Sequence, residues 1–280
     1  MHLDVGAFIA LLFGAALLAG FLGSLTGLGG GVVIVPLLTI AFGVDIRYAI
    51  GASLVSVIAT SSGAASAFVR EGYSNIRIGM VLEIATTLGA LVGAYLGGVL
   101  SSSVIAIVFG CALIYSALLS LRARHEHAPA HTSDPLAVRL RLPSRYPVGG
   151  EMVEYGVHNV PAGFGLMGLA GVLSGLLGIG SGAVKVLAMD HAMKLPFKVS
   201  TTTSNFMIGV TAAASAGVYL HRGYIDPILA MPVVLGVLVG SLAGARVLGR
   251  AHPRVLRLVF GIVLFALALE MIFNGATGRI

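Results

Sequence analysis

Long apolar runs, separated by short polar or glycine-rich breaks, dominate the chain. A membrane-spanning helix needs about 20 consecutive and mostly apolar residues, and several runs approach or reach that length. Five apolar segments occupy the first half, at 3–22, 32–42, 49–69, 78–100 and 104–121. Five more occupy the second half, at 162–177, 183–193, 199–220, 228–248 and 255–273. This pattern predicts an all-α polytopic membrane protein. The first segment follows Asp4 and no basic stretch, so we expect a retained helix there rather than a signal peptide.

A glycine-rich break follows the first apolar segment of each half. It reads Gly-Leu-Gly-Gly-Gly at 27–31 and Gly-Ile-Gly-Ser-Gly at 178–182, an offset of 151 residues, from 27 to 178. The same offset carries Ser53 onto Ser204 and Thr60 onto Thr211 without a gap. One ungapped register over roughly seventy residues indicates an internal duplication.

The duplication divides the chain into three parts. We predict a first membrane repeat at 1–121, a basic connector at 122–161 and a second membrane repeat at 162–280. In each repeat a glycine-broken or re-entrant pair of segments precedes three transmembrane helices, so each repeat ends on the side opposite its start. The two repeats would then be inverted relative to one another.

Basic residues support this inverted topology. With the connector in the cytoplasm and both termini outside, the other basic loops also fall on the cytoplasmic side, as the positive-inside rule requires. Those loops carry Arg70, Arg77, Lys194, Lys198, Arg246, Arg250, Arg254 and Arg257.

Composition supports the membrane assignment. Hydrophobic residues make up 57% of the chain and charged residues only 10%, against about 25% charged in ordinary soluble domains. We therefore expect a multi-pass protein of the cell membrane, in contact with the lipid bilayer. The net charge of +6 is concentrated in a few loops, so we interpret it as a topology signal and expect no nucleic-acid partner. The sequence leaves room for a homodimer.

Metal and cofactor signals are weak. The single cysteine, Cys111, excludes an internal disulfide and a cysteine-based metal cluster. The histidines at 125, 127 and 131 would suit a metal ion, but a flexible, solvated loop is the favoured reading. We expect no cofactor and no metal site.

Glycine breaks inside the membrane indicate a binding site for an anion. Non-helical backbone at that depth is tolerated where protein buries it or where it lines a wet cavity. The helix that resumes after each break presents free N–H groups and the positive end of its dipole. Two such N-termini facing each other would form an anion site near the midplane. In the alternative reading, these small residues only let helices pack closely.

Hydroxyl-rich stretches after the breaks add neutral donors suited to oxyanion oxygens. The predicted substrate-binding residues are Gly27, Gly29, Gly30, Gly31, Ser53, Gly178, Gly180, Ser181, Gly182, Lys185, Thr202, Thr203, Ser204 and Asn205.

These motifs resemble the TauE/SafE sulfite exporter family, also called the toluene-sulfonate uptake permease group. The resemblance rests on the duplicated glycine motif, Pro36, the Gly-Ala-Ser at 51–53 and the stretch at 203–209, and it covers residues 6–121 and 162–275. It implies a permease, often thought to be proton-driven, for sulfite, sulfonates, sulfoacetate or thiosulfate. The chain departs from the family pattern at Ser181, where glycine is usual, and at Leu187, which lies opposite Pro36.

Four ionisable residues in or beside apolar segments are candidates for a role in transport. Glu83 either carries a proton or extends to the membrane interface beside Arg77, and Asp190 and His191 are further proton-coupling candidates. Lys185 replaces Ile34 of the first copy, less than one turn from the N-terminus of the resumed helix. It either pairs with the substrate anion, extends to the cytoplasmic end, or pairs with Asp190 or Glu83.

The leading prediction is therefore a secondary transporter, and not an enzyme. It would carry small sulfur oxyanions or organosulfonates between the two glycine turns. Two other classes remain open: an intramembrane enzyme, which would need paired catalytic acids or metal ligands, and a membrane scaffold for a partner in sulfur metabolism.

Overall fold

The computed structural model describes residues 5–26, 31–70, 73–121, 132–148, 151–248 and 253–280. Helices make up most of this part of the chain. The first half contains α1 (Val5–Thr26), α2 (Gly31–Pro36), α3 (Ile46–Arg70), α4 (Ile76–Gly97) and α5 (Ser102–Leu121). A connector follows with α6 (Pro135–Arg139), β1 (Ser144–Val148) and β2 (Glu151–Tyr155). The second half contains α7 (Val160–Leu177), α8 (Gly182–Leu187), α9 (Phe197–His221), α10 (Pro227–Leu248) and α11 (Pro253–Ala276).

Helix boundaries recur at the offset read from the sequence. The short helices α2 and α8, the long helices α3 and α9, and the helices α4 and α10 each begin and end 151 residues apart, as from 31 to 182. A single π-helical turn follows each short helix, at Leu37–Ala41 and at Ala188–Ala192. The two halves therefore repeat their secondary structure element by element.

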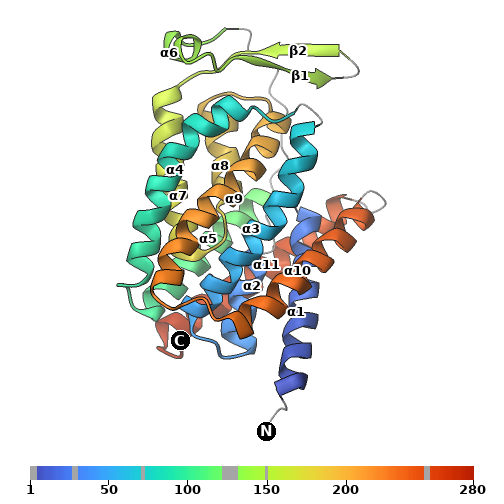
Figure 1. Ribbon diagram of the computed structural model, residues 1–280, viewed down its shortest axis with the longest axis vertical. Coiled ribbons are helices and arrows are strands. Elements are labelled where there is room, and N and C mark those ends of the chain that lie inside the picture. Colours follow the sequence, from blue (N-terminus) through green and yellow to red (C-terminus); the bar gives the residue numbers. More distant parts are fainter. Residues whose placement is uncertain (1–4, 27–30, 71–72, 122–131, 149–150, 249–252) are drawn as a thin grey trace.

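Each half packs its first helix against the other half. Helix α1 lies along α10, and α7 lies along α4 (Figure 1). Glycines make both contacts close: a Cβ at Gly240 would lie 2.0 Å from the Leu17 carbonyl oxygen, and one at Gly175 would lie 2.0 Å from that of Ala90. Only residues without a Cβ allow backbones to approach in this way.

Equivalent helices of the two halves pack in opposite directions. At one end of the central pair, Gly51 of α3 contacts the backbone of Tyr224, just beyond α9, and at the other end Gly209 of α9 contacts Ser61. Helices α5 and α11 are likewise antiparallel, since Gly110 meets Ala268 while Gly275 meets Ser103. The first turn of α1 and the C-terminal end lie at the bottom of Figure 1, opposite the connector.

The connector is partly a β-hairpin, so the prediction of an all-α chain is wrong there. Strands β1 and β2 pair antiparallel at the top of Figure 1. The Asn75 amide nitrogen, at the N-cap of α4, donates to the Leu142 carbonyl at 3.0 Å and to the Tyr155 hydroxyl at 2.7 Å. Burial raises the pKa of that hydroxyl, which therefore stays protonated at neutral pH. These bonds fasten the hairpin to the helices.

Four described helices, α1, α4, α7 and α10, are long and apolar enough to cross a membrane. Shorter apolar stretches lie at 31–41, 46–62, 102–118 and 261–276. The central α9 carries a hydroxyl-rich first half, and its apolar neighbours cover much of it. The arrangement is that of a polytopic helical membrane protein.

The contact between α4 and α7 provides a test of glycine packing. A Cβ at Gly171 would lie 2.1 Å from the Thr86 carbonyl oxygen, whereas one at Gly168, a turn earlier, would meet only the Ala85 carbonyl oxygen at 3.9 Å. We expect Gly171→Ala to destabilise the protein by about 1–3 kcal/mol, because the two backbones must separate. Gly168→Ala should be neutral or stabilise by about 0.5 kcal/mol. Thermal unfolding of the two purified variants in detergent measures the difference, and equal midpoints would contradict this account.

Candidate functional site

The two glycine breaks meet at the centre of the molecule. Gly31, which begins α2, and Gly178, which ends α7, lie on either side of Ser53 from α3. The Ser53 hydroxyl lies 2.8 Å from the Gly178 carbonyl oxygen and 3.4 Å from that of Gly31, and it donates to these carbonyls. The equivalent hydroxyl in the second half, Ser204, donates to the Gly182 carbonyl at 3.3 Å. Hydroxyls on the central helix pair thus hold both breaks in place.

The second break needs glycine for its backbone geometry. Gly178, Gly180 and Ser181 have φ angles of 68°, 71° and 47°, in the left-handed region that residues with a Cβ avoid. Gly178 also ends α7, its N–H donating to the Ser174 carbonyl at 2.8 Å. The first N–H groups of the next helix have no partner within that helix. This turn therefore combines left-handed backbone with N–H donors that its own helix leaves unpaired.

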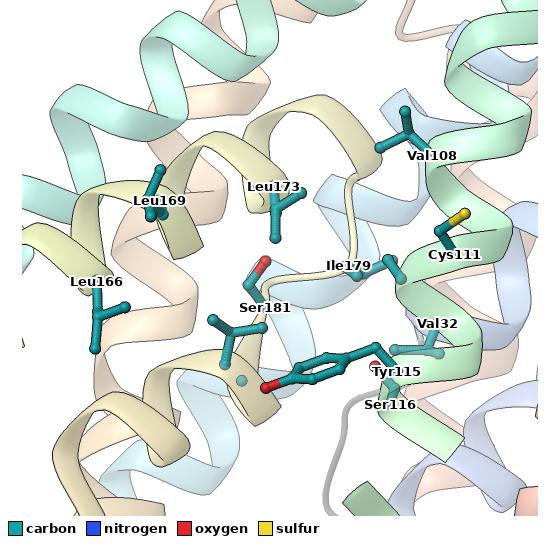
Figure 2. A pocket seen from close by; sticks show the side chains of 13 residues that line it. Val32, Val108, Cys111, Tyr115, Ser116, Leu166, Leu169, Leu173, Ile179 and Ser181 are labelled. Carbon is teal, nitrogen blue, oxygen red and sulfur yellow. The ribbon is translucent and has the colours of Figure 1, made fainter. Parts of the chain in front are cut away.

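A cavity of about 380 Å³ opens onto this turn. Its walls come from α5, α7 and the start of α8, with Val32 of α2 at its edge (Figure 2). Most of the lining is apolar, and the Ser181 side chain points into the space between Leu173 and Tyr115 (Figure 2). Ser181 is only 3% exposed, and within the described residues its hydroxyl has no hydrogen-bond partner. The cavity therefore offers an apolar wall and one uncommitted hydroxyl beside the glycine turn.

The hydroxyl-rich stretch of α9 is mostly occupied by local bonds. Thr202 donates to the Lys198 carbonyl at 2.9 Å, and the Thr203 hydroxyl accepts from the Asn75 backbone N–H at 3.0 Å. The structure places Asn205 on the same helix, half-buried. In this conformation the Thr202 and Thr203 hydroxyls are occupied by protein partners, whereas those of Ser200 and Ser181 have none among the described residues.

Lys185 points away from the cavity, toward α9 and α4. Its ammonium group donates to the Thr211 hydroxyl at 2.5 Å, and that hydroxyl donates to the Glu83 carboxylate at 2.6 Å. Lys185 and Thr211 are fully buried and Glu83 is 8% exposed. The sequence left several partners open for Lys185 and for Glu83. In the structure the two side chains are linked to each other through Thr211, and Glu83 lies inside the protein rather than at the membrane interface.

The remaining candidates lie elsewhere or outside the described residues. Asp190 and His191 form a contact of 3.5 Å within the π-helical turn after α8, several residues beyond Lys185. Gly27, Gly29 and Gly30 fall outside the described residues, as do His125, His127 and His131. Sequence reasoning missed the wall of the cavity on α5 and the bridging role of Thr211. The available signal for Thr211 was its repetition as Thr60 in the first half.

Comparisons with known proteins agree with this architecture. Residues 12–271 match the family model described as sulfite exporter TauE/SafE. The chain is 28% identical to the probable membrane transporter protein YunE of Bacillus subtilis, over 92% of this chain and 95% of that protein. A probable membrane transporter protein of Xylella fastidiosa is 26% identical, over 93% and 94% of the two chains. No solved structure matches the chain significantly.

Duplicated helical bundles with broken helices are common among secondary transporters. The match over nearly the whole chain places this protein in the TauE/SafE sulfite exporter family, which confirms the resemblance read from its motifs.

The bridging hydroxyl of Ser53 gives a direct test of how the breaks are held. We expect Ser53→Ala to lower the stability by about 1–3 kcal/mol, because it leaves two buried carbonyls without this donor. Ser62→Ala is the matched control, since that exposed hydroxyl bonds only one turn back, to the Ile58 carbonyl. Thermal unfolding in detergent compares the two variants. If the unfolding midpoint of Ser53→Ala equals that of Ser62→Ala, the Ser53 hydroxyl does not stabilise the two glycine breaks.

Proposed function

We propose that the protein is a permease for small sulfur-containing anions, such as sulfite, sulfoacetate or other organosulfonates. The observation that carries this proposal is the meeting of the two glycine breaks at Ser53, with free helix N–H groups and the unpartnered Ser181 hydroxyl at the second break. The name of the matching family supports the choice of anion. Backbone donors and a hydroxyl suit the oxygens of a sulfonate or sulfite group.

The cavity favours organosulfonates among these anions. A sulfonate group at Ser181 would leave its organic portion against the apolar side chains of Leu173 and Ile179, which line the cavity and are half-buried and buried. Apolar area removed from water contributes roughly 25 cal/mol per Å². An inorganic anion would gain nothing from that wall. The binding site is therefore the second glycine turn together with the cavity beside it.

We further propose that the two repeats are inverted across the membrane. Equivalent helices pack antiparallel at two places, α3 with α9 and α5 with α11. Inverted repeats support alternating access, because each half can offer the central site to its own side of the membrane. Positive charge supports the same orientation, since Arg77, Arg145, Lys194 and Lys198 lie on or beside the connector.

An intramembrane enzyme and a scaffold fit less well. Within the described residues no group of three or more histidine, cysteine, aspartate or glutamate side chains could hold a metal ion. The buried carboxylate Glu83 is linked to a lysine rather than to a second acid. A scaffold would have no use for a buried polar site and a cavity at the broken helices.

Flux through proteoliposomes tests the function. With purified protein, labelled sulfite and a panel of labelled sulfonates (methanesulfonate, 2-hydroxyethanesulfonate, toluenesulfonate and sulfoacetate) should cross at rates far above those of empty liposomes, and should emerge chemically unchanged. A chemically altered product would indicate an enzyme, and no flux of any member would contradict the permease.

Gly180→Val tests the turn in the same assay. A Cβ there would lie 2.8 Å from the Ile208 Cγ2 atom, and the φ of 71° is unfavourable for a β-branched residue. We expect flux to fall at least tenfold while the protein still inserts into the membrane. Gly217→Val is the control, because a Cβ at Gly217 meets nothing within 4 Å. Normal flux in Gly180→Val would show that the glycine turn serves helix packing and does not bind the substrate.

Cysteine labelling tests the topology. In a Cys111→Ala background, Ser102→Cys should react with an impermeant reagent from outside the cell, and Arg141→Cys only from the cytoplasmic side. The two positions lie at opposite ends of the molecule in the sense of Figure 1, at the start of α5 and in the connector. Labelling of both from one side would overturn the inverted arrangement.

A further inference from the structure

Two buried charges break the repeat at matching places. Most residues that face the central site are small or apolar in both halves, but Glu83 in the first half and Lys185 in the second each lie where the other half carries an aliphatic side chain. Under the offset of 151 the correspondences are Lys185 with Ile34, Glu83 with Val234, and Thr211 with Thr60. One set of equivalent positions is therefore Lys-Thr-Glu and the other is Ile-Thr-Val. Both charges occur in the same set, which marks them as a pair.

Contacts in the structure join the pair through the shared threonine. The Lys185 ammonium donates to Thr211, and Thr211 donates to the Oε1 atom of Glu83, which also accepts from Thr87 at 3.2 Å. Glu83 belongs to α4 of the first half, whereas Lys185 and Thr211 belong to α8 and α9 of the second half. The chain of bonds therefore crosses between the two repeats.

No other charge lies at this depth in the described part of the surrounding helices. Helix α7 carries no ionisable residue, and the others on α4 and α9 lie near helix ends: Arg77, Tyr95, Lys198, Tyr219 and His221. Asp190 and His191 lie in the turn beyond α8. Lys185 and Glu83 thus have only each other as charged partners, and a buried charge without one is strongly disfavoured.

Only one of the two oxygens of the Glu83 carboxylate accepts hydrogen bonds among those described. The Oε2 atom of Glu83 is buried and has no hydrogen-bond partner among the described residues. A buried carboxylate oxygen without a hydrogen-bond partner is unfavourable, and a proton bound there would neutralise the charge. The Lys185 end of the pair is tied to the glycine turn, because the Lys185 backbone N–H donates to the Ser181 carbonyl at 3.0 Å.

We propose that, when the substrate binds, Lys185 gives up its link to Glu83 and pairs with the substrate anion instead. Glu83 then takes a proton from the aqueous solution at its carboxylate. This inference rests on the proposed function as an anion permease. In the empty state the ammonium and the carboxylate neutralise each other through Thr211. In the loaded state the anion neutralises the ammonium and the proton neutralises Glu83. The buried site has no net charge in either state when the anion is monovalent, so one proton accompanies each monovalent anion carried.

Loading would also alter the contact between the repeats. While Glu83 is ionised, its bond to Thr211, which in turn accepts from Lys185, connects α4 of the first half to α8 and α9 of the second. Protonation of Glu83 and departure of Lys185 remove the attraction across this contact. Proton and anion together therefore release the two halves, whereas either one alone leaves a lone charge in the protein.

Simultaneous measurement of anion and proton flux tests the exchange. Monovalent sulfonates serve as the probe, namely methanesulfonate, 2-hydroxyethanesulfonate and toluenesulfonate, because they stay ionised at neutral pH and carry no proton themselves. Proteoliposomes with a pH-sensitive dye inside should acidify as labelled sulfonate enters, with one proton per sulfonate. A proton gradient directed inward should accelerate uptake at least tenfold.

Two variants separate coupling from structure. Glu83→Gln should still pass sulfonate down its own gradient but lose both the acidification and the acceleration by the proton gradient. The double variant Lys185→Ile with Glu83→Val copies the Ile-Thr-Val set found at the repeat-related positions, so it should fold with an unfolding midpoint near that of the wild type and lack proton coupling. It keeps the test informative if Glu83→Gln does not fold.

The outcomes are distinct for the two proposals. Sulfonate entry without acidification in the wild type would overturn this inference and leave the permease intact, as would proton coupling that persists in Glu83→Gln or in the double variant. Absence of sulfonate and sulfite flux altogether would overturn the permease itself.

Discussion

Backbone contact between the two halves is the constraint on which the rest of the structure depends. Helix α1 lies against α10 and α7 against α4 at glycines where any side chain would meet a carbonyl oxygen. Inside a membrane, packing and hydrogen bonds replace the hydrophobic effect as the force between helices, so close approach at small residues supplies much of the association energy. Each half therefore provides the wall that encloses the other half's broken helix.

The breaks themselves are held by side chains of the central pair. Ser53 and Ser204 occupy equivalent places, and each donates to the carbonyl of the residue that begins the adjacent short helix. Ser53 also reaches Gly178, so one hydroxyl joins both breaks. These bonds tie both short helices to the central pair, and the first N–H groups of the short helices have no partner within their own helix.

Near-symmetry makes the departures from symmetry informative. Ser181 occupies a position where the first half has a glycine, and its hydroxyl points into a cavity. Lys185 and Glu83 occupy positions where the equivalent residues are aliphatic, and they lie at the two ends of one hydrogen-bonded chain. Duplicated positions explain how the scaffold is built, whereas the unmatched polar residues indicate where the two halves perform different tasks.

The sequence by itself determined the membrane class, the duplication, the element boundaries to within a few residues and the family, because apolar run length and a fixed repeat offset are local properties of the chain. It also placed Ser53 and the second glycine turn in the candidate site. Only the tertiary structure decided that Lys185 faces Glu83 rather than the cavity and that Thr211 bridges them. It also decided that Thr202 bonds within α9 and that Thr203 accepts from Asn75. Side-chain direction and the contacts between α4, α8 and α9 depend on how segments that are distant in the sequence pack together. The hydropathy pattern does not contain that information. The hairpin in the connector escaped prediction for a related reason, since its strands are short and mostly exposed and are stabilised by Asn75 from another element.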